Sequence, residues 1–120
     1  MNTVLSSNMS KRDLVKAKVS TTSFKDYKEQ QLKLFGGVIY DSESVNEETG
    51  EVEKQRVSAI KMKNENGEDE VIASISKTVT DSLDVILSEF EDEEIANGID
   101  IIVKAKTSNS GREFLYIDLV

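Results

Sequence analysis

The sequence contains neither cysteine nor histidine, and no apolar run approaches the roughly 18 residues that a membrane span needs. Without cysteine there is no disulfide framework and no thiolate metal site. The lack of both residue types excludes zinc chemistry and histidine-based acid–base or nucleophilic catalysis. Residues 1–13 lack the apolar segment of a secretory signal. These absences predict a cytoplasmic protein that is not an enzyme, does not enter a membrane and holds no metal or cofactor.

Charge is unevenly distributed along a chain whose 120 residues suit a single domain. The net charge is −8, which is unfavourable for contact with nucleic-acid phosphates. However, residues 1–40 carry seven Lys/Arg against three Asp/Glu, whereas residues 41–100 carry five against eighteen. We therefore expect a flexible basic N-terminal arm over residues 1–23 and a folded domain over residues 24–120. The acidic clusters taken alone are typical of solvated turns or helix faces.

The stretch from Gln31 to Val45, QLKLFGGVIYDSESV, is the segment around which the fold is expected to form. Apolar and polar residues alternate along it, which is typical of a half-buried strand. Gly36 and Gly37 interrupt the alternation, and glycines inside a strand often mark a bulge, a bend or a close approach of another backbone. A long strand bent in this way can pair with both halves of a small barrel.

The remaining pattern predicts four more strands and one helix. After the long strand, a turn at residues 46–50 precedes a second strand, and Asn66-Gly67 marks a hairpin. The stripe formed by Leu83, Ile86, Leu87 and Phe90 predicts a helix with Phe90 in the core. The capping-box pattern Ser10-Lys11-Arg12-Asp13 favours a helix, although alternation over residues 15–19 leaves a strand open. The expected elements are strands over residues 51–63, 70–77, 99–107 and 113–119, a hairpin at 64–69, and a helix from Thr78 or Thr80 to about Glu91.

The element order, β-β-β-α-β-β, is that of an OB-fold, a five-stranded Greek-key barrel with one helix between its third and fourth strands. The class is mainly β. PH-like and other small barrels also contain long meanders, so they remain alternatives. An OB-fold binds oligonucleotides over its second and third strands and with the loops that join strands one and two and strands four and five.

Single-strand binding without sequence preference needs cations along the phosphates and exposed rings on which bases stack. Strand parity places Phe114 and Tyr116 opposite the apolar Leu115 and Ile117. Arg112 follows a Ser-Asn-Ser-Gly turn, whose donors suit a phosphate. The predicted nucleic-acid-binding residues are Lys33, Phe35, Arg56, Lys61, Lys63, Lys77, Lys104, Lys106, Arg112, Phe114 and Tyr116.

Several of these residues could instead have purely structural roles. The glycine bulge can shift the inside–outside phase and bury Phe35, and Tyr40 can close the barrel. Phe114 and Tyr116 can face an oligomer interface instead of a base, and scattered lysines are ordinary on a surface.

Three stretches of the chain resemble a known class of protein. The runs SISKTVTDSLDVILSEF and IIVKAKTSNSGREFLYIDL are similar to the C-terminal half of single-stranded DNA-binding proteins of bacteriophages that infect Gram-positive hosts, lactococcal phages among them. The run FKDYKEQQLKLFGGVIYDS resembles their first strand. The resemblance implies an OB-fold that coats single-stranded DNA in the host cytoplasm during phage replication and recombination. It also implies a homo-oligomer, a dimer or larger, with phage replication or recombination proteins as possible partners.

Two other classes of function compete with this hypothesis. A small barrel can instead be a protein-interaction or virion-assembly module, with the acidic segments 41–53 and 81–94 as its docking surface. A magnesium-dependent nuclease would need three or four carboxylates close together, and no spacing in the sequence predicts such a cluster.

Overall fold

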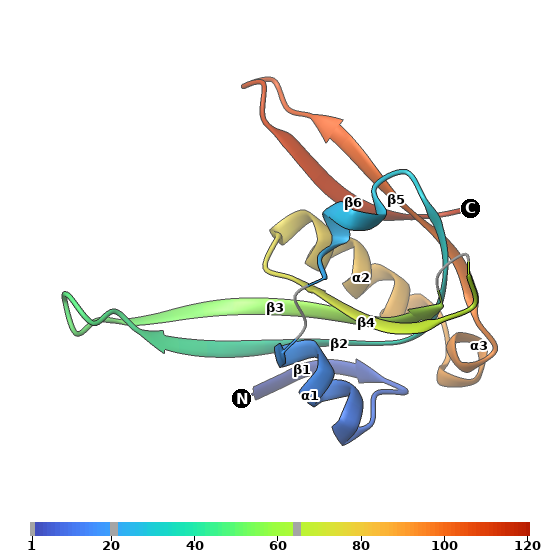
Figure 1. Cartoon of the computed structure of the whole chain (residues 1–120), viewed down its shortest axis with the longest axis horizontal. Helices are drawn as coiled ribbons and strands as arrows, with labels where there is room; N and C mark the ends of the chain where they lie inside the picture. Colours follow the sequence, from blue (N-terminus) through green and yellow to red (C-terminus); the bar gives the residue numbers. More distant parts are fainter. Residues whose placement is uncertain (1, 20–21, 64–65) are drawn as a thin grey trace.

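In the computed structural model, which describes residues 2–19, 22–63 and 66–120, the long strand β2 (Gln31–Val45) pairs along both of its edges. Strand β3 (Val52–Lys63) follows one edge over nearly its whole length. The other edge is shared between β5 (Ile99–Thr107), which pairs with residues 31–34, and β1 (Asn2–Ser7), which pairs with residues 37–41 (Figure 1). The sequence therefore predicted both the bounds and the double pairing of this strand.

The glycine pair in β2 marks a bulge, as predicted. The register with β3 shifts between Leu34 and Gly36. A Cβ atom at Gly36 would lie 2.9 Å from the carbonyl oxygens of both Ser7 and Asn8, so only glycine lets the end of β1 approach this closely. The bulge is where the edge of β2 passes from β5 to β1.

The sheet contains six antiparallel strands in the order β4-β3-β2-β5-β6, with β1 joined to β2 off this path. Strands β4 (Asp69–Ser74) and β6 (Glu113–Leu119) form its two edges. The helices are α1 (Lys11–Val19), the 3₁₀ helix η1 (Phe24–Tyr27), α2 (Lys77–Glu89) and α3 (Asp92–Ala96). The prediction of a mainly β chain is confirmed.

The predicted closed five-stranded barrel is not observed, because the sheet stays open between β4 and β6 across the described residues. Other groups occupy the gap. Ser23 forms a parallel bridge with Ala73 of β4. The Thr78 hydroxyl of α2 donates to the Leu115 carbonyl oxygen (2.6 Å), and the Ser82 Oγ accepts from the Ile117 N–H (3.0 Å). Helix side chains thus satisfy backbone groups of β6 that a neighbouring strand would otherwise pair.

The sheet is covered on both faces. The larger core lies between one face of the sheet and α2, and it includes Leu34, Ile60, Leu83 and Ile101, each fully buried. Phe90 packs against this core, as the apolar stripe predicted. A smaller cluster lies on the opposite face under α1 and consists of Ala17, Val38, Tyr40, Ala59 and Val71. Tyr40 is therefore buried beneath α1.

The structure of the N-terminal residues differs from the flexible basic N-terminal segment that the sequence predicted over residues 1–23. Residues 2–7 form β1, and residues 11–19 form a helix and not a strand. The capping box is present, since the Ser10 N–H donates to Asp13 Oδ2 (3.0 Å) and the Asp13 N–H donates to Ser10 Oγ (3.2 Å). The Ser7 hydroxyl also donates to Asp92 Oδ1 (2.7 Å). Pairing with β2 and packing of α1 join this segment to the rest of the fold.

The other predicted elements fall close to their expected positions. Strands β5 and β6 have the predicted bounds, whereas β4 is shorter and α2 begins earlier, with Ser76 as its N-cap residue. The hairpin predicted at residues 64–69 lies partly outside the described residues, which omit 64 and 65. Helix α3 was not predicted. None of the helices within the described ranges is long and apolar enough to cross a membrane.

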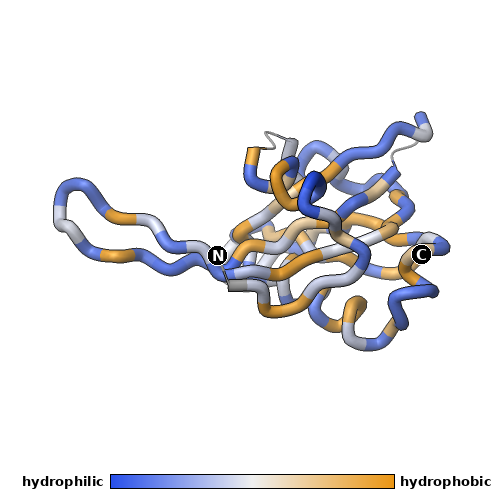
Figure 2. The backbone as a smooth tube through the Cα atoms, turned by 90° about the horizontal axis from the view of Figure 1, so that it is seen from below, coloured by the Kyte–Doolittle hydropathy of each residue, from blue (hydrophilic) through white to orange (hydrophobic). Residues whose placement is uncertain are grey.

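The β2–β3 hairpin extends far beyond the body of the fold. Past Asp41, the last residue of β2 that pairs with β1, residues 42–45 pair only with residues 52–55. We call this two-stranded ribbon, residues 42–55, the arm. Figure 2 shows the arm projecting from the body as a mainly hydrophilic ribbon. Isolated two-stranded hairpins are marginally stable, so the body and the arm's own contacts must hold it.

Asp13 is the buried acid that anchors α1, with an exposed fraction of 6% and an ion pair to Lys61 Nζ (3.4 Å). Burial alone would raise the pKa of Asp13. Hydrogen bonds from the backbone and side chain of Ser10 and the charge of Lys61 outweigh it, so the pKa of Asp13 lies below its usual value. A carboxyl with a lowered folded-state pKa stabilises the fold above its unfolded pKa, and this stability is lost as the pH falls through the folded value.

We expect Asp13→Asn to lower the free energy of unfolding by about 1–3 kcal/mol at pH 7, because charge-assisted hydrogen bonds are lost. The difference between the variant and the wild type should begin to shrink below about pH 4, near the unfolded pKa of a carboxyl, and should disappear as the pH falls through the lower folded-state pKa of Asp13. Urea denaturation at pH 7 and pH 3 measures both values. Asp81→Asn is the control, because Asp81 forms only an exposed pair with Lys77. An equal difference at both pH values would contradict the assigned role of the carboxylate.

Candidate nucleic-acid interface

The eleven predicted binding residues lie in four places. Five belong to the β5–β6 hairpin: Lys104, Lys106, Arg112, Phe114 and Tyr116. Four lie at the β2–β3 pairing near the bulge: Lys33, Phe35, Lys61 and Lys63. Arg56 lies on β3 where it pairs with Asp41 of β2, and Lys77 begins α2. The structure therefore brings together two groups of cations and rings, and leaves Arg56 and Lys77 outside both.

The β5–β6 hairpin carries two rings and two lysines on its outer face. Leu115 and Ile117 are buried in the core, so the alternation turns Phe114 and Tyr116 outward, where both are half-buried. Lys104 lies opposite Tyr116 in the ladder, and Lys106 lies opposite Phe114. The two ring centroids are 6.5 Å apart, and Lys106 Nζ lies 5.1 Å from the Tyr116 centroid. The parity prediction is confirmed for this hairpin.

The cations of the hairpin differ in how far they are neutralised. Lys104 Nζ contacts Asp118 Oδ2 at 3.1 Å, and this hydrogen bond raises the pKa of Lys104 and lowers the pKa of Asp118. Neither Lys106 nor Arg112 forms an ion pair with any acid in the part of the chain described. The turn before Arg112 is held by hydroxyls, because Ser108 Oγ accepts the Arg112 N–H (3.3 Å) and contacts Ser110 Oγ (2.9 Å). The hairpin end thus presents a fixed turn beside an uncompensated guanidinium.

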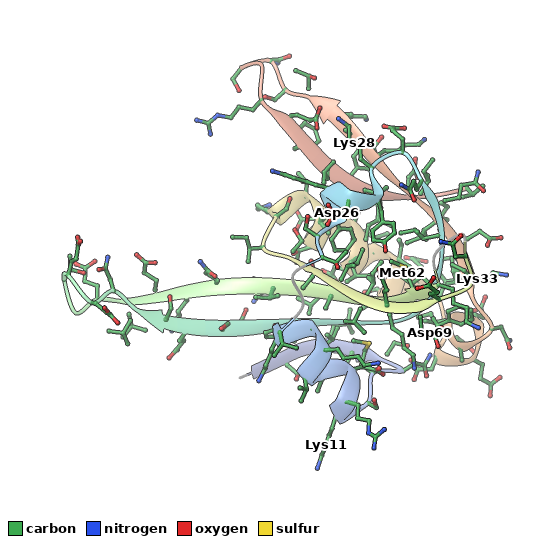
Figure 3. All side chains as sticks on the ribbon, viewed as in Figure 1. Lys11, Asp26, Lys28, Lys33, Met62 and Asp69 are labelled. Atoms are coloured by element: carbon green, nitrogen blue, oxygen red, sulfur yellow. The ribbon has the colours of Figure 1, made fainter. Side chains whose placement is uncertain are left out.

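The second group gathers at the bulge of β2. Lys33 and Lys63 are directly opposite each other, and Lys63 Nζ lies 5.6 Å from the Phe35 ring centroid. Phe35 is half-buried, so only part of its side chain is exposed. Each lysine has an acid nearby: Lys33 Nζ is 3.9 Å from Asp100, and Lys63 Nζ is 4.0 Å from Asp69. Figure 3 shows Lys33 and Asp69 at the same end of the sheet. Positive charge is therefore weaker here than at the β5–β6 hairpin.

Lys61 of the second group and the two cations outside both groups are also paired with acids. Lys61 pairs with Asp13 beneath α1, so α1 covers part of the outer face on which binding by the second strand was predicted. Arg56 makes two hydrogen bonds to Asp41, of 2.8 and 3.3 Å, which raise the pKa of Arg56 and lower that of Asp41. Lys77 Nζ contacts Asp81 at 3.0 Å within α2. None of the three adjoins the paired rings of the hairpin.

A groove beside Phe114 was not predicted from the sequence. It has a volume of about 550 Å³ and lies along the open seam between β4 and β6. Phe114 and Leu115 line one wall, and Ala73 and Ile75 line the other, with Ile75 65% exposed. The groove exists only because the sheet is open. The sequence predicted a closed barrel, which would have no groove between these two strands.

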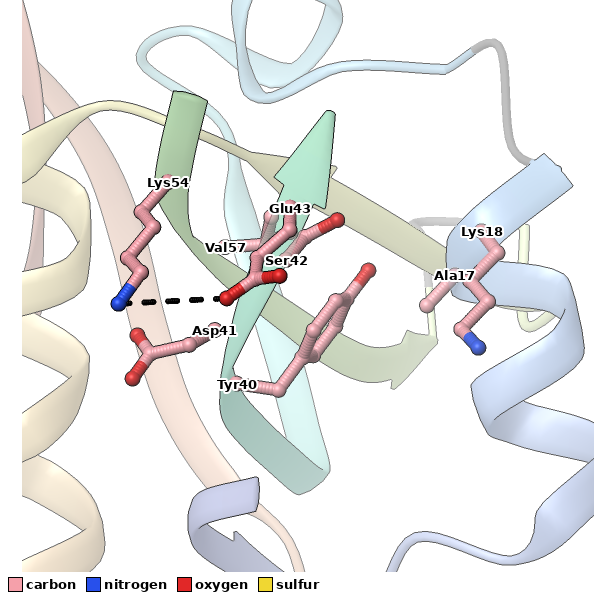
Figure 4. Close-up of a pocket in the computed structure, with 8 residues that line it drawn as sticks. All are labelled: Ala17, Lys18, Tyr40, Asp41, Ser42, Glu43, Lys54 and Val57. Atoms are coloured by element: carbon pink, nitrogen blue, oxygen red, sulfur yellow. Dashed lines mark ion pairs between the residues drawn. The ribbon is translucent and has the colours of Figure 1, made fainter. Parts of the chain in front are cut away.

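A larger hollow, of about 690 Å³, separates the end of α1 from the base of the arm (Figure 4). Ala17 and Lys18 form one side, and Tyr40 and Val57 are among the residues of the other. Burial raises the pKa of the Tyr40 hydroxyl. Lys54 and Glu43, which also line the hollow, pair with each other at 4.0 Å. Charges of both signs compensate each other here, so the hollow does not select an anionic ligand.

Acidic side chains do not form a metal site in residues 2–19, 22–63 and 66–120, where no three of them gather closely enough to hold an ion. No protein-family model, curated protein or solved structure matches this chain. Arguments about function therefore rest on the chemistry of its own surfaces.

Proposed function

We propose that this protein is a non-enzymatic protein that binds single-stranded DNA with little sequence preference, through the outer face of the β5–β6 hairpin. The observation that carries the proposal is the pair of rings, Phe114 and Tyr116, with Lys106 5.1 Å from the Tyr116 centroid. Bases of any sequence can stack on such rings while cations contact the phosphates. Arg112 at the hairpin end supplies a further cation without an acidic partner in the described ranges.

The order of the strands supports an OB-like interpretation of the fold. The order β4-β3-β2-β5-β6, with α2 between β4 and β5, is that of a five-stranded barrel opened between its third and fifth strands. OB-folds are themselves partly open barrels, and the loop between their last two strands contributes to binding. In this proposal the protein coats single strands in a host cytoplasm during phage replication or recombination, as the sequence resemblance implied.

The test is a fluorescence titration of labelled oligo-dT at about 50 mM salt, where phosphate contacts are strongest. We expect Arg112→Ala to weaken binding to oligo-dT and to a mixed-sequence oligonucleotide by similar factors, and to reduce the salt slope by about one. Lys77→Ala is the matched control, because Lys77 is already paired with Asp81 and lies outside the hairpin. Absence of binding by the wild type at this salt concentration would exclude the proposed function.

A second candidate function, a protein-interaction module, is favoured by one observation. Six of the predicted cations have acids within 4.0 Å: Lys33, Arg56, Lys61, Lys63, Lys77 and Lys104. Such pairing weakens any field that would attract phosphates. If oligo-dT does not bind, this second function accounts better for the surface.

A further inference from the structure

Two surfaces of opposite charge lie outside the proposed DNA-binding hairpin. The first is the end of the arm, called the acidic tip, which comprises residues 45–53 and carries four Glu and no Lys or Arg. The second is the exposed side of α1, called the basic face, which comprises Lys11, Arg12, Val15, Lys16, Lys18 and Val19. Neither surface is explained by the packing of the body.

The acidic tip presents a pair of valines on a fixed turn. Val45 and Val52 are directly opposite in the ladder and are 64% and 57% exposed. The turn between them is closed by hydrogen bonds from the Asn46 N–H to the Glu51 carbonyl oxygen (2.8 Å) and from the Gly50 N–H to the Asn46 carbonyl oxygen (2.7 Å). Because the turn is already ordered, docking it costs little conformational entropy. The two valines form an exposed apolar pair at the end of a hydrophilic ribbon.

The basic face of α1 has the complementary pattern. Val15 and Val19 are one helical turn apart and are 60% and 70% exposed. Across the described residues, the four surrounding cations form no ion pair, and a shallow hollow of about 380 Å³ lies among Lys11, Arg12, Val15 and Lys16. Asp13 and Ala17 on the opposite side of the helix fix it to the sheet. Figure 3 shows the Lys11 side chain pointing away from the body.

The acidic tip cannot reach the basic face of its own chain. Four paired residues beyond Asp41 carry the tip roughly 13 Å past the last contact with β1. The ladder is continuous from the body to Val45 and Val52, so the ribbon does not fold back. Figure 1 shows the tip pointing away from α1. A partner of either surface would therefore come from another molecule.

We propose that the acidic tip of one copy of this chain docks on the basic face of α1 of a second copy. Four Glu residues then meet four Lys/Arg residues, and the valine pair of the tip packs against the valines of the helix. A second copy fits both surfaces at once, whereas a foreign partner would explain one of them. The contact joins different patches of the two copies, so repetition builds a ring or an open array. The inference goes beyond the proposed DNA binding and does not depend on it.

Charge reversal on each surface tests the contact directly. Lys11→Glu/Lys16→Glu takes the net charge of the helix face from +4 to zero, and Glu47→Lys/Glu51→Lys takes that of the tip from −4 to zero. Each variant then loses the net attraction between its two surfaces, and we expect its self-association to weaken at least about tenfold relative to the wild type. In an equimolar mixture, the unchanged acidic tip of the first variant meets the unchanged basic face of the second. Assembly should therefore return in the mixture.

Sedimentation velocity at about 50 mM and 500 mM salt gives the mass of each sample, because exposed charge pairs are screened at high salt. The wild type should exceed the 13.4 kDa monomer at low salt and approach it at high salt. Glu89→Lys/Glu93→Lys is the control for the tip variant, with the same change of charge, +4, on α2 and α3. Circular dichroism checks that every variant is folded, and the wild-type salt series tests the contact without any substitution.

Three results would overturn the proposal: a monomeric wild type at low salt, assembly of either reversed variant as strong as that of the wild type, or a mixture that assembles no better than its components. If Lys11→Glu/Lys16→Glu instead abolishes oligo-dT binding while the mass stays unchanged, the basic face binds nucleic acid and the proposed contact is wrong. If the wild type does not bind oligo-dT, the proposed function is excluded, but the mass measurements still test the contact between copies.

Discussion

Leu83→Ala is expected to lower the free energy of unfolding by about 2–5 kcal/mol, the range for a large-to-small change in a packed core. Leu83 is fully buried at the centre of α2, in the helix that fills the opening of the sheet. Its Cδ1 atom lies 3.3 Å from the position of a Cβ atom at Gly37, so the helix rests directly on the backbone of β2. Removing the side chain leaves a cavity at that contact.

Urea denaturation measures this loss, and Val85→Ala is the matched control. Val85 lies on the same helix but is 62% exposed, so its substitution should change the free energy of unfolding by less than about 0.5 kcal/mol. Similar losses for the two variants would mean that α2 does not support the sheet through Leu83.

The second large effect is expected for Phe114→Ala combined with Tyr116→Ala. Stacking on a ring contributes about 1–3 kcal/mol per base, so loss of both rings should weaken binding of oligo-dT by at least about 30-fold. The rings lie side by side on the hairpin, with centroids 6.5 Å apart, so two neighbouring bases can use them. The same fluorescence titration measures the affinity.

Leu119→Ala controls for a general effect of truncation on β6, because Leu119 is on the same strand and is 46% exposed. Thermal unfolding checks that the double variant is folded. An affinity equal to that of the wild type would show that the rings do not hold bases. If Phe35→Ala produced the larger loss, the binding face would instead lie at the bulge of β2, where Lys63 lies over Phe35.

Local patterns in the sequence were sufficient to predict the elements that have one apolar and one polar face. Alternation and the glycine pair predicted β2 and its bulge, and the same alternation put Phe114 and Tyr116 on the outer face of β6. These features depend on the period of a strand and therefore appear in a single segment. Strand β1 was missed because the short polar run NTVLSS has no such pattern and becomes a strand only by pairing with residues 37–41.

Contacts between distant segments could not be predicted. Lys61 was expected to face a ligand, but it pairs with Asp13, which lies in a different element. The open seam depends on hydroxyls of α2 that bond β6, and serine or threonine on a helix gives no such signal. Helix α3 did carry a local signal, because Glu91 and Glu94 form a capping box that the sequence shows.

The shared edge of β2 also sets the order in which the chain can assemble during synthesis. Strands β1 to β4 all precede α2, so this part of the sheet can form while the last third of the chain is still unmade. Residues 31–34 must then wait for β5, with their backbone groups and the apolar Leu32 and Leu34 uncovered. Until β5 is made, this short edge of β2 has no partner strand and is open to pairing with other strands.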